Sequence, residues 1–322
     1  MDKWYYIGII CVGGIEMTNP ATEQPSEYSQ NLDTLSSDAI LSILHEGQIV
    51  AAKSVSNSIR EIEKAALLLA DTVNGGGNII YAAAGSSALM ALADGLELPG
   101  TFGIKNDRIK ILMAGGIASL TNMTGNTEDD FDQAANDIQC ARATSHDCLI
   151  CLSASGSTPY ALSALEAARD AGTRTIAIAN NPDRPLLVNA DISIYLATPP
   201  EIISGSTRLG AATAQKICLN MMSTLMAVHL GHVHDGNMVN LQADNAKLKK
   251  RAAQMVQDIA GCSKNHADSF LNKAQGSVKL AVLLASGAPD LISAKKLLES
   301  NDQKLRASLS VIKGARVQNQ PN

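Results

Sequence analysis

The feature that most constrains the fold of this chain is a regular alternation of short apolar runs with helical patterns. The apolar runs have the length of buried strands and lie at Asn78–Ala84, Ile109–Met113, Cys148–Ser153, Thr175–Ala179 and Ile192–Leu196. Helical periodicity follows at about 87–96, 129–140, 159–171 and 207–230. Crossovers of this length join neighbouring parallel strands, with helices packed on both faces of the sheet. The sequence therefore predicts an α/β fold, a parallel sheet sandwiched by helices.

The segments on either side of this region differ from it in character. We predict three parts: an N-terminal extension or arm at 1–36, the sheet domain at 37–243, and an all-helical C-terminal subdomain at 244–322. The sheet domain should open with one or two long amphipathic helices between Ala39 and Thr72. Residues 1–16 are expected to be unstructured. Their apolar run is too short to cross a bilayer, so no membrane association is expected.

Three turns rich in hydroxyl side chains stand at predicted helix starts. A helix start presents unpaired backbone N–H groups and the positive end of the helix dipole, which together favour an anion. In a parallel sheet, ligands bind at the carboxyl ends of the strands, where such turns lie. We therefore predict a binding site for a phosphorylated small molecule, formed by Ser86, Ser87, Ser153, Ser155, Gly156, Ser157, Thr158, Glu201, Ser206, Thr207 and Arg208.

The three turns differ in how strongly they indicate a ligand. Ser86 and Ser87 are equally well explained by simple helix capping, which needs one hydroxyl. The second turn carries four hydroxyls around Gly156, more than capping requires. In the third turn, Arg208 could form charge-assisted bonds with a phosphate. Glu201 either contacts sugar hydroxyls or is a solvated loop acid, and the sequence leaves both possibilities open.

Other residues that could carry chemistry have simpler explanations. Cys148 and Cys151 form a Cys-x-x-Cys motif, but it lies inside an apolar strand, where buried thiols are expected. His229, His232 and His234 have no acidic or thiol partner at a metal-binding spacing. We therefore expect no metal and no cofactor. The cysteine usage fits a reducing cytoplasm, and the net charge of −5 argues against nucleic acid as a partner.

Taken together, these segments resemble the N-acetylmuramic acid 6-phosphate etherases, a branch of the sugar-isomerase (SIS) phosphosugar-binding family. The resemblance runs from about Leu32 into the helical tail and is most specific at residues 201–220, with further matches at Thr22-Glu23, 94–103 and 153–160. It implies a SIS-type fold, a phosphorylated amino sugar as substrate and no cofactor. It also implies a homodimer, because sites in this family lie near a subunit boundary.

The resemblance further implies cleavage of the D-lactyl ether of N-acetylmuramic acid 6-phosphate by elimination and water re-addition. The two glutamates of this reaction fall on Glu97, as proton donor, and Glu128, as base. The residues alone do not fix these roles, since Glu97 could be an exposed loop acid and Glu128 part of an ordinary helix start. A phosphosugar isomerase and a non-catalytic sugar-phosphate sensor are the alternatives.

Three positions depart from the pattern of the family. Leu89, Ser157 and Gly210 stand where the resemblance would place cations. Three missing cations should weaken the binding of an anionic, lactyl-bearing substrate. The departures therefore affect the identity of the sugar more than the fold or the phosphate site.

Overall fold

The computed structural model describes residues 20–318 apart from positions 242 and 244. The expectation that residues 1–16 are unstructured lies outside the described residues. Five strands form one sheet in the order β2-β1-β3-β4-β5, and every neighbouring pair is parallel. Their bounds are β1 (Ile79–Ala83), β2 (Ile109–Met113), β3 (Cys148–Leu152), β4 (Arg174–Ala179) and β5 (Ile192–Tyr195). The predicted parallel sheet is confirmed.

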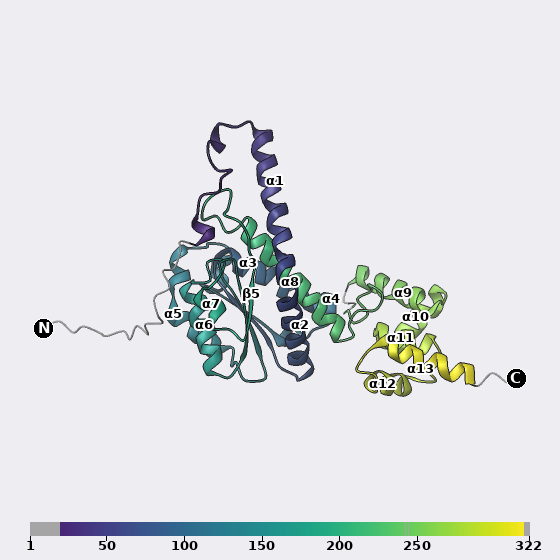
Figure 1. Ribbon diagram of the computed structural model, residues 1–322. Helices are drawn as coiled ribbons and strands as arrows, with labels where there is room; N and C mark the ends of the chain where they lie inside the picture. The colour runs from purple at the N-terminus through teal and green to yellow at the C-terminus, as the bar shows by residue number, and fades with distance from the viewer. Residues whose placement is uncertain (1–19, 242, 244, 319–322) are drawn as a thin grey trace.

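Helices cover both faces of this sheet, as predicted (Figure 1). One face packs against α2 (Ile59–Asn74), α3 (Gly85–Gly95), α4 (Leu98–Phe102) and α8 (Gly210–His229). The other packs against α5 (Phe131–Cys140), α6 (Pro159–Asp170) and α7 (Pro185–Val188). Side chains alternate along each strand, so Tyr81 enters the first core and Ile80 the second. All five residues of β1 are buried because helices lie on both sides of it.

Helix α1 (Ser37–Ser54) precedes α2 and projects away from the body of the molecule (Figure 1). Ser36 caps it by accepting a hydrogen bond from the backbone N–H of Ala39. A short 3₁₀ turn at Val55–Ser58 separates α1 from α2, so the predicted helical stretch is two helices. Ala51 and Ser54 are the buried residues of α1. Its other residues are half-buried or exposed, so part of the helix surface remains uncovered within the described chain.

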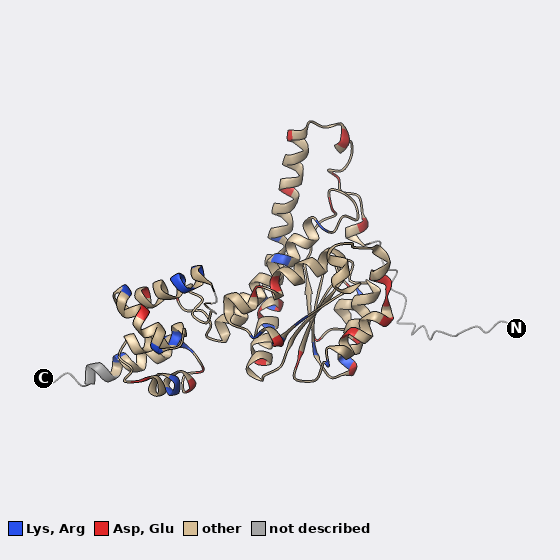
Figure 2. Ribbon diagram, turned by 180° about the vertical axis from the view of Figure 1, so that it is seen from behind, with Lys and Arg blue, Asp and Glu red and all other residues tan. Residues whose placement is uncertain are grey.

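In the described part of the tail, five helices share an apolar core of their own. They are α9 (Ala246–Ala260), α10 (Lys264–Lys273), α11 (Val278–Ala285), α12 (Leu291–Glu299) and α13 (Leu305–Gln318). The tail lies beyond the C-terminal end of α8, and basic and acidic positions are interspersed along its helices (Figures 1 and 2). Within the described part of the chain, no helix is both long and apolar enough to cross a membrane.

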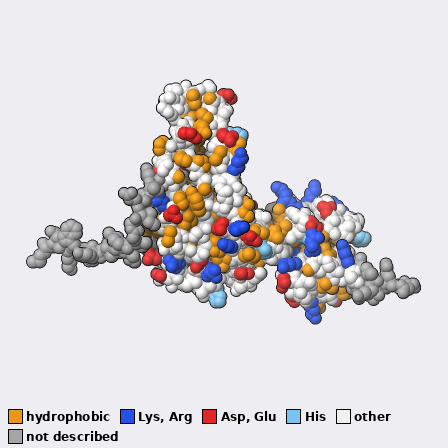
Figure 3. All heavy atoms as spheres, in the orientation of Figure 1, with side chains coloured by type: hydrophobic (Ala, Val, Ile, Leu, Met, Phe, Trp, Pro, Cys, Tyr) orange, Lys and Arg blue, Asp and Glu red, His pale blue; other side chains and the backbone are white. Residues whose placement is uncertain are grey.

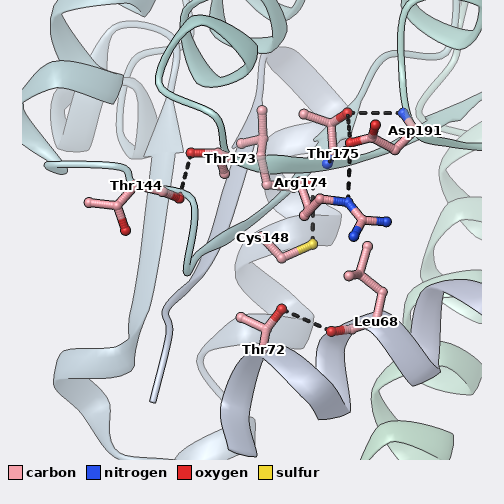
Figure 4. Close-up of polar contacts among 9 residues, drawn as sticks. Leu68, Thr72, Thr144, Cys148, Thr173, Arg174, Thr175 and Asp191 are labelled. Carbon is pink, nitrogen blue, oxygen red and sulfur yellow. Dashed lines mark hydrogen bonds and ion pairs between the residues drawn. The ribbon is translucent and has the colours of Figure 1, made fainter. Parts of the chain in front are cut away.

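The amino edge of the sheet is held together by polar contacts, several of which are drawn in Figure 4. Asp191 accepts hydrogen bonds from the backbone N–H and the hydroxyl of Thr175, at 2.7 and 3.0 Å. Cys148 begins β3 beside Arg174 of β4. Cys148 and Cys151 are both fully buried, and burial raises the pKa of the Cys151 thiol to about 12. The interpretation of these cysteines as buried strand thiols is confirmed.

Candidate functional site

The strand order determines where a ligand can bind. From β1 the chain continues to β2 on one side, and the next strand, β3, returns to the other side of β1. In sheets of this order the ligand crevice opens outside the carboxyl ends of the two strands at that reversal. The first hydroxyl-rich turn leaves β1 at Gly85, and the second leaves β3 at Ser153. The fold therefore brings these two turns to opposite sides of one crevice.

The second turn is held by hydrogen bonds among its own hydroxyls. Ser153 Oγ lies 2.8 Å from Thr158 Oγ1 and 3.2 Å from Ser155 Oγ, and it accepts the backbone N–H of Gly156 at 3.0 Å. Gly156 has φ +72, and a Cβ there would lie 2.6 Å from Cβ of Arg184, so glycine is required at this position. In the described structure no side chain caps α6, whose first turn follows Thr158. The turn is therefore a preformed group of hydroxyls at an uncapped helix start.

The first turn is built around Gly85, where α3 begins two residues earlier than predicted. Gly85 has φ +55, a conformation that residues with a Cβ rarely adopt. A Cβ at this position would lie 2.6 Å from Glu128 Oε1, so the Glu128 carboxyl rests directly against the Gly85 backbone. Ser86 is half-buried and Ser87 is buried, and no described side chain caps α3. The start of α3 thus has a carboxyl group beside it.

Glu128 comes from a 3₁₀ turn at Gly125–Asp129, which follows β2. Its side chain is half-buried, and this burial raises the pKa of the carboxyl. The negative charge of Asp129 raises that pKa further. A carboxyl with a raised pKa both accepts and returns a proton more readily near neutral pH, which suits a general acid–base residue.

Glu97, the second predicted catalytic residue, lies elsewhere in the chain. It is exposed and immediately precedes α4, beyond the C-terminal end of α3. Helix α3 has 11 residues, which corresponds to about 16 Å at 1.5 Å per residue. Because Glu128 lies at the start of α3, the two carboxyl groups are not brought together within one chain.

The third turn differs from the expectation of free N–H groups. Glu201 is 4% exposed, and its two carboxylate oxygens accept the backbone N–H groups of Gly210 and Ala211 at 2.9 Å each. Burial raises the pKa of Glu201, and these two N–H groups oppose the shift. The alternative of a solvated loop acid is wrong, since Glu201 caps α8. Of the other predicted residues here, Ser206 and Thr207 are half-buried and Arg208 is exposed.

Sequence reasoning missed a contribution from the N-terminal arm. Thr22 is 1% exposed, and its carbonyl accepts the backbone N–H of Gly205 at 3.0 Å. The side-chain amide of Asn181 donates to Thr22 Oγ1 at 3.0 Å and to the Ala154 carbonyl at 2.9 Å. Thr22 therefore links the second turn to the third. The available signal was the pair of amides, Asn180 and Asn181, directly after the β4 strand.

Comparison with known proteins gives a consistent family. A family model described as SIS domain matches residues 45–180. An N-acetylmuramic acid 6-phosphate etherase of Geobacillus thermodenitrificans (strain NG80-2) is 36% identical over 289 residues, which cover 90% of this chain and 98% of that protein. An etherase of the same name from Deinococcus radiodurans is 39% identical over 269 residues, 83% of this chain and 88% of that protein. Among solved structures, a phosphoheptose isomerase from Francisella tularensis aligns with a TM-score of 0.47 at 20% identity, covering 60% of this chain and 100% of that one.

Proposed function

Because this chain belongs to the N-acetylmuramic acid 6-phosphate etherase family, we propose that its hydroxyl-rich turns hold the phosphate of that sugar beside Glu128. The chain is a carbon–oxygen lyase that cleaves the D-lactyl ether of N-acetylmuramic acid 6-phosphate, giving N-acetylglucosamine 6-phosphate and D-lactate. The observation that carries the assignment of Glu128 is its half-buried carboxyl with a raised pKa, packed against Gly85 at the β1–β3 crevice.

The proposed phosphate site is formed mainly by the second turn. Ser153, Ser155, Ser157 and Thr158 offer hydroxyls, and the uncapped start of α6 offers backbone N–H groups. In this proposal, Ser86 and Ser87 would contribute from the first turn, at the start of α3. The positions where the family resemblance expects cations hold Leu89, Ser157 and Gly210, so hydroxyls and helix starts would supply most of the attraction here.

The proposed reaction begins with the open-chain sugar, whose C1 aldehyde acidifies the proton on C2. Glu128, as carboxylate, removes that proton, and the C3–O bond breaks with departure of the lactate oxygen. Glu97, as carboxylic acid, protonates this oxygen, which leaves D-lactate and a 2,3-unsaturated aldehyde. Water then adds to C3 while its proton passes to the Glu97 carboxylate, and Glu128 returns a proton to C2. Each positioned acid or base contributes on the order of 10²–10⁴-fold.

This assignment requires a second copy of the chain, because Glu97 and Glu128 are separated within one chain by the length of α3. We propose a homodimer in which the copies meet along α1. Exposed apolar side chains on and beside this helix, including Leu41 at 65% exposure, support such an interface (Figure 3). A cavity of about 710 Å³ between α1, the arm and the loop at 199–202 adds further unfilled surface there. Helices gain most of their stability by packing an apolar face, and within its own chain α1 buries only Ala51 and Ser54 completely.

We also propose a cytoplasmic location. Five cysteines in the described part of the chain, Cys140, Cys148, Cys151, Cys218 and Cys262, are free thiols, which fits a reducing compartment.

The test is to incubate the enzyme with N-acetylmuramic acid 6-phosphate in water labelled with deuterium and ¹⁸O. We expect D-lactate, deuterium at C2 and ¹⁸O at C3 of the sugar. Glu128→Gln should abolish lactate release and C2 labelling together, whereas Glu97→Gln should abolish lactate release. Release of lactate without either label would exclude elimination and re-addition. Formation of a ketose phosphate without lactate would identify an isomerase instead.

A further inference from the structure

The short helix α4 carries Glu97 at its start and is fixed at its other end by residues that follow α8. The side-chain amide of Asn240 donates to the Phe102 carbonyl, the last of α4, at 3.0 Å. The largely buried imidazole of His232 lies beside the same stretch of backbone at Phe102. The side chain of Asn240 thus holds the last carbonyl of α4.

The backbone on both sides of this contact is closely packed. Gly103 ends α4 with φ +66, and a Cβ there would lie 2.2 Å from the Asn240 carbonyl oxygen. Only glycine allows the two backbones to approach so closely. The side chains of Leu98 and Phe102 are buried beneath α4. The helix therefore cannot shift at its C-terminal end without disturbing the segment around Asn240.

The N-terminal side of Glu97 is anchored to the same long helix. The backbone N–H of Glu97 donates to the Asp94 carbonyl at 3.1 Å. The buried Asp94 carboxyl accepts hydrogen bonds from Tyr81 of β1 and Ser223 of α8, both at 2.9 Å. Helix α8 therefore supports Glu97 from one side through Ser223 and from the other through the segment that follows it. Figure 1 shows α4 beside the end of α8, where the sheet domain meets the tail.

We propose that Asn240 is a positioning residue for Glu97, acting through the Phe102 carbonyl and the short helix α4. This inference rests on the proposed role of Glu97 as proton donor. The side chain of Glu97 is exposed at the junction between α3 and α4, so burial does not fix the direction of its carboxyl. The contacts of Asn240 with Phe102 and Gly103 at the other end of α4 supply that constraint. The tail contacts the segment that follows α8 as well, because Gln303 of the tail accepts a hydrogen bond from Lys279 and packs against Gly231, next to His232.

The test compares Asn240→Ala with Asn237→Ala, a matched control in the same segment whose side chain donates to the Asp235 carbonyl. Lactate release, deuterium entry at C2 and the thermal midpoint are measured for each variant. Asn240→Ala should slow lactate release on the order of 10- to 100-fold, since a displacement of about 1 Å costs about 10²-fold. Deuterium entry at C2 depends on Glu128 and should stay within about twofold of wild type.

A double variant distinguishes positioning from a general loss of structure. In a Glu97→Gln background, where lactate release is already lost, Asn240→Ala should leave deuterium entry at C2 within about twofold of Glu97→Gln alone, because the contacts of Asn240 act through Glu97. A further decrease in C2 exchange in that background, or equal losses in lactate release and C2 exchange for Asn240→Ala itself, would overturn the inference. Asn240→Asp keeps the side-chain shape but replaces the N–H donor, and it serves if the alanine variant does not fold. If Glu97→Gln alone releases lactate at the wild-type rate, the proposed role of Glu97 fails, whatever Asn240 does.

Discussion

The contact between Gly85 and Glu128 allows a sharp test of the proposed base, through the substitution Gly85→Ala. The new Cβ would lie 2.6 Å from Glu128 Oε1, where ordinary contact begins at 3.4 Å. The carboxyl must therefore retreat by about 0.8 Å, the difference between these two distances. A displacement of about this size at a catalytic group lowers the rate on the order of 10²-fold. We expect that loss in both deuterium entry at C2 and lactate release.

Alanine at this position also strains the backbone, because φ is +55. The strain of a left-handed conformation costs about 1–2 kcal/mol and lowers stability irrespective of Glu128. Gly261→Ala is the matched control, since Gly261 has φ +65 at the end of α9 and no atom within 4 Å of the new Cβ. Both variants should lose similar free energy of unfolding in urea titrations, whereas only Gly85→Ala should lose activity.

The outcome that refutes this reasoning is equally specific. If Gly85→Ala and Gly261→Ala are equally destabilised and both exchange the C2 proton within threefold of wild type, the Glu128 carboxyl does not need its place beside Gly85. The base would then have to be sought elsewhere in the crevice.

Three further changes have expected outcomes. Asp129→Asn removes a charge that raises the pKa of Glu128, so the acid limb of the pH profile of kcat/KM should move to lower pH. If this limb does not move, Glu128 is not the base whose titration it reports. Glu201→Ala leaves two buried N–H groups unpaired and should lower the free energy of unfolding, measured in urea, by about 2 kcal/mol. A raised KM with unchanged stability would instead show that Glu201 contacts the sugar. Burial lowers the pKa of Lys279 from 10.5 to about 8. Between those pH values the unfolded chain therefore binds more protons than the folded one, and the free energy of unfolding of the wild type should rise with pH by about 3 kcal/mol in all. Lys279→Met should remove that rise, and a pH profile of stability that the variant leaves unchanged would show that Lys279 titrates normally.

The sheet could be predicted from sequence because its signal is local. The central strands, such as Cys148–Leu152, are buried on both faces and read as continuous apolar stretches. The edge strands β2 and β5 are mostly half-buried, but their apolar runs are long enough to be recognised. The first residues of the helices were predicted less accurately. Helix α3 begins at Gly85, which has a positive φ and lies against Glu128, a contact between positions 43 residues apart that no local pattern contains.

The site was predicted only as far as its local turns allow. The second turn could be recognised because Ser153, Ser155 and Thr158 bond to one another within a few residues. The link through Thr22 could not be recognised from the sequence, because its partner Asn181 lies 159 residues away along the chain. The separation of Glu97 from Glu128 also depends on the direction in which α3 runs, which the spacing of two glutamates does not reveal.

Glu201 and Glu128, which both lie beside helix starts, show why residue type and position do not by themselves assign a function. Glu201 binds the first N–H groups of α8 with both oxygens, so its charge is used to complete a helix. Glu128 lies beside the start of α3, but burial and Asp129 both raise its pKa, which favours the protonated form. Burial raises the pKa of Glu201 as well, but both of its oxygens already accept backbone N–H groups, so they are not available to take a proton from a substrate. The environment of each carboxyl therefore assigns structure to Glu201 and proton transfer to Glu128, and Asp129→Asn and Glu201→Ala test the two assignments separately.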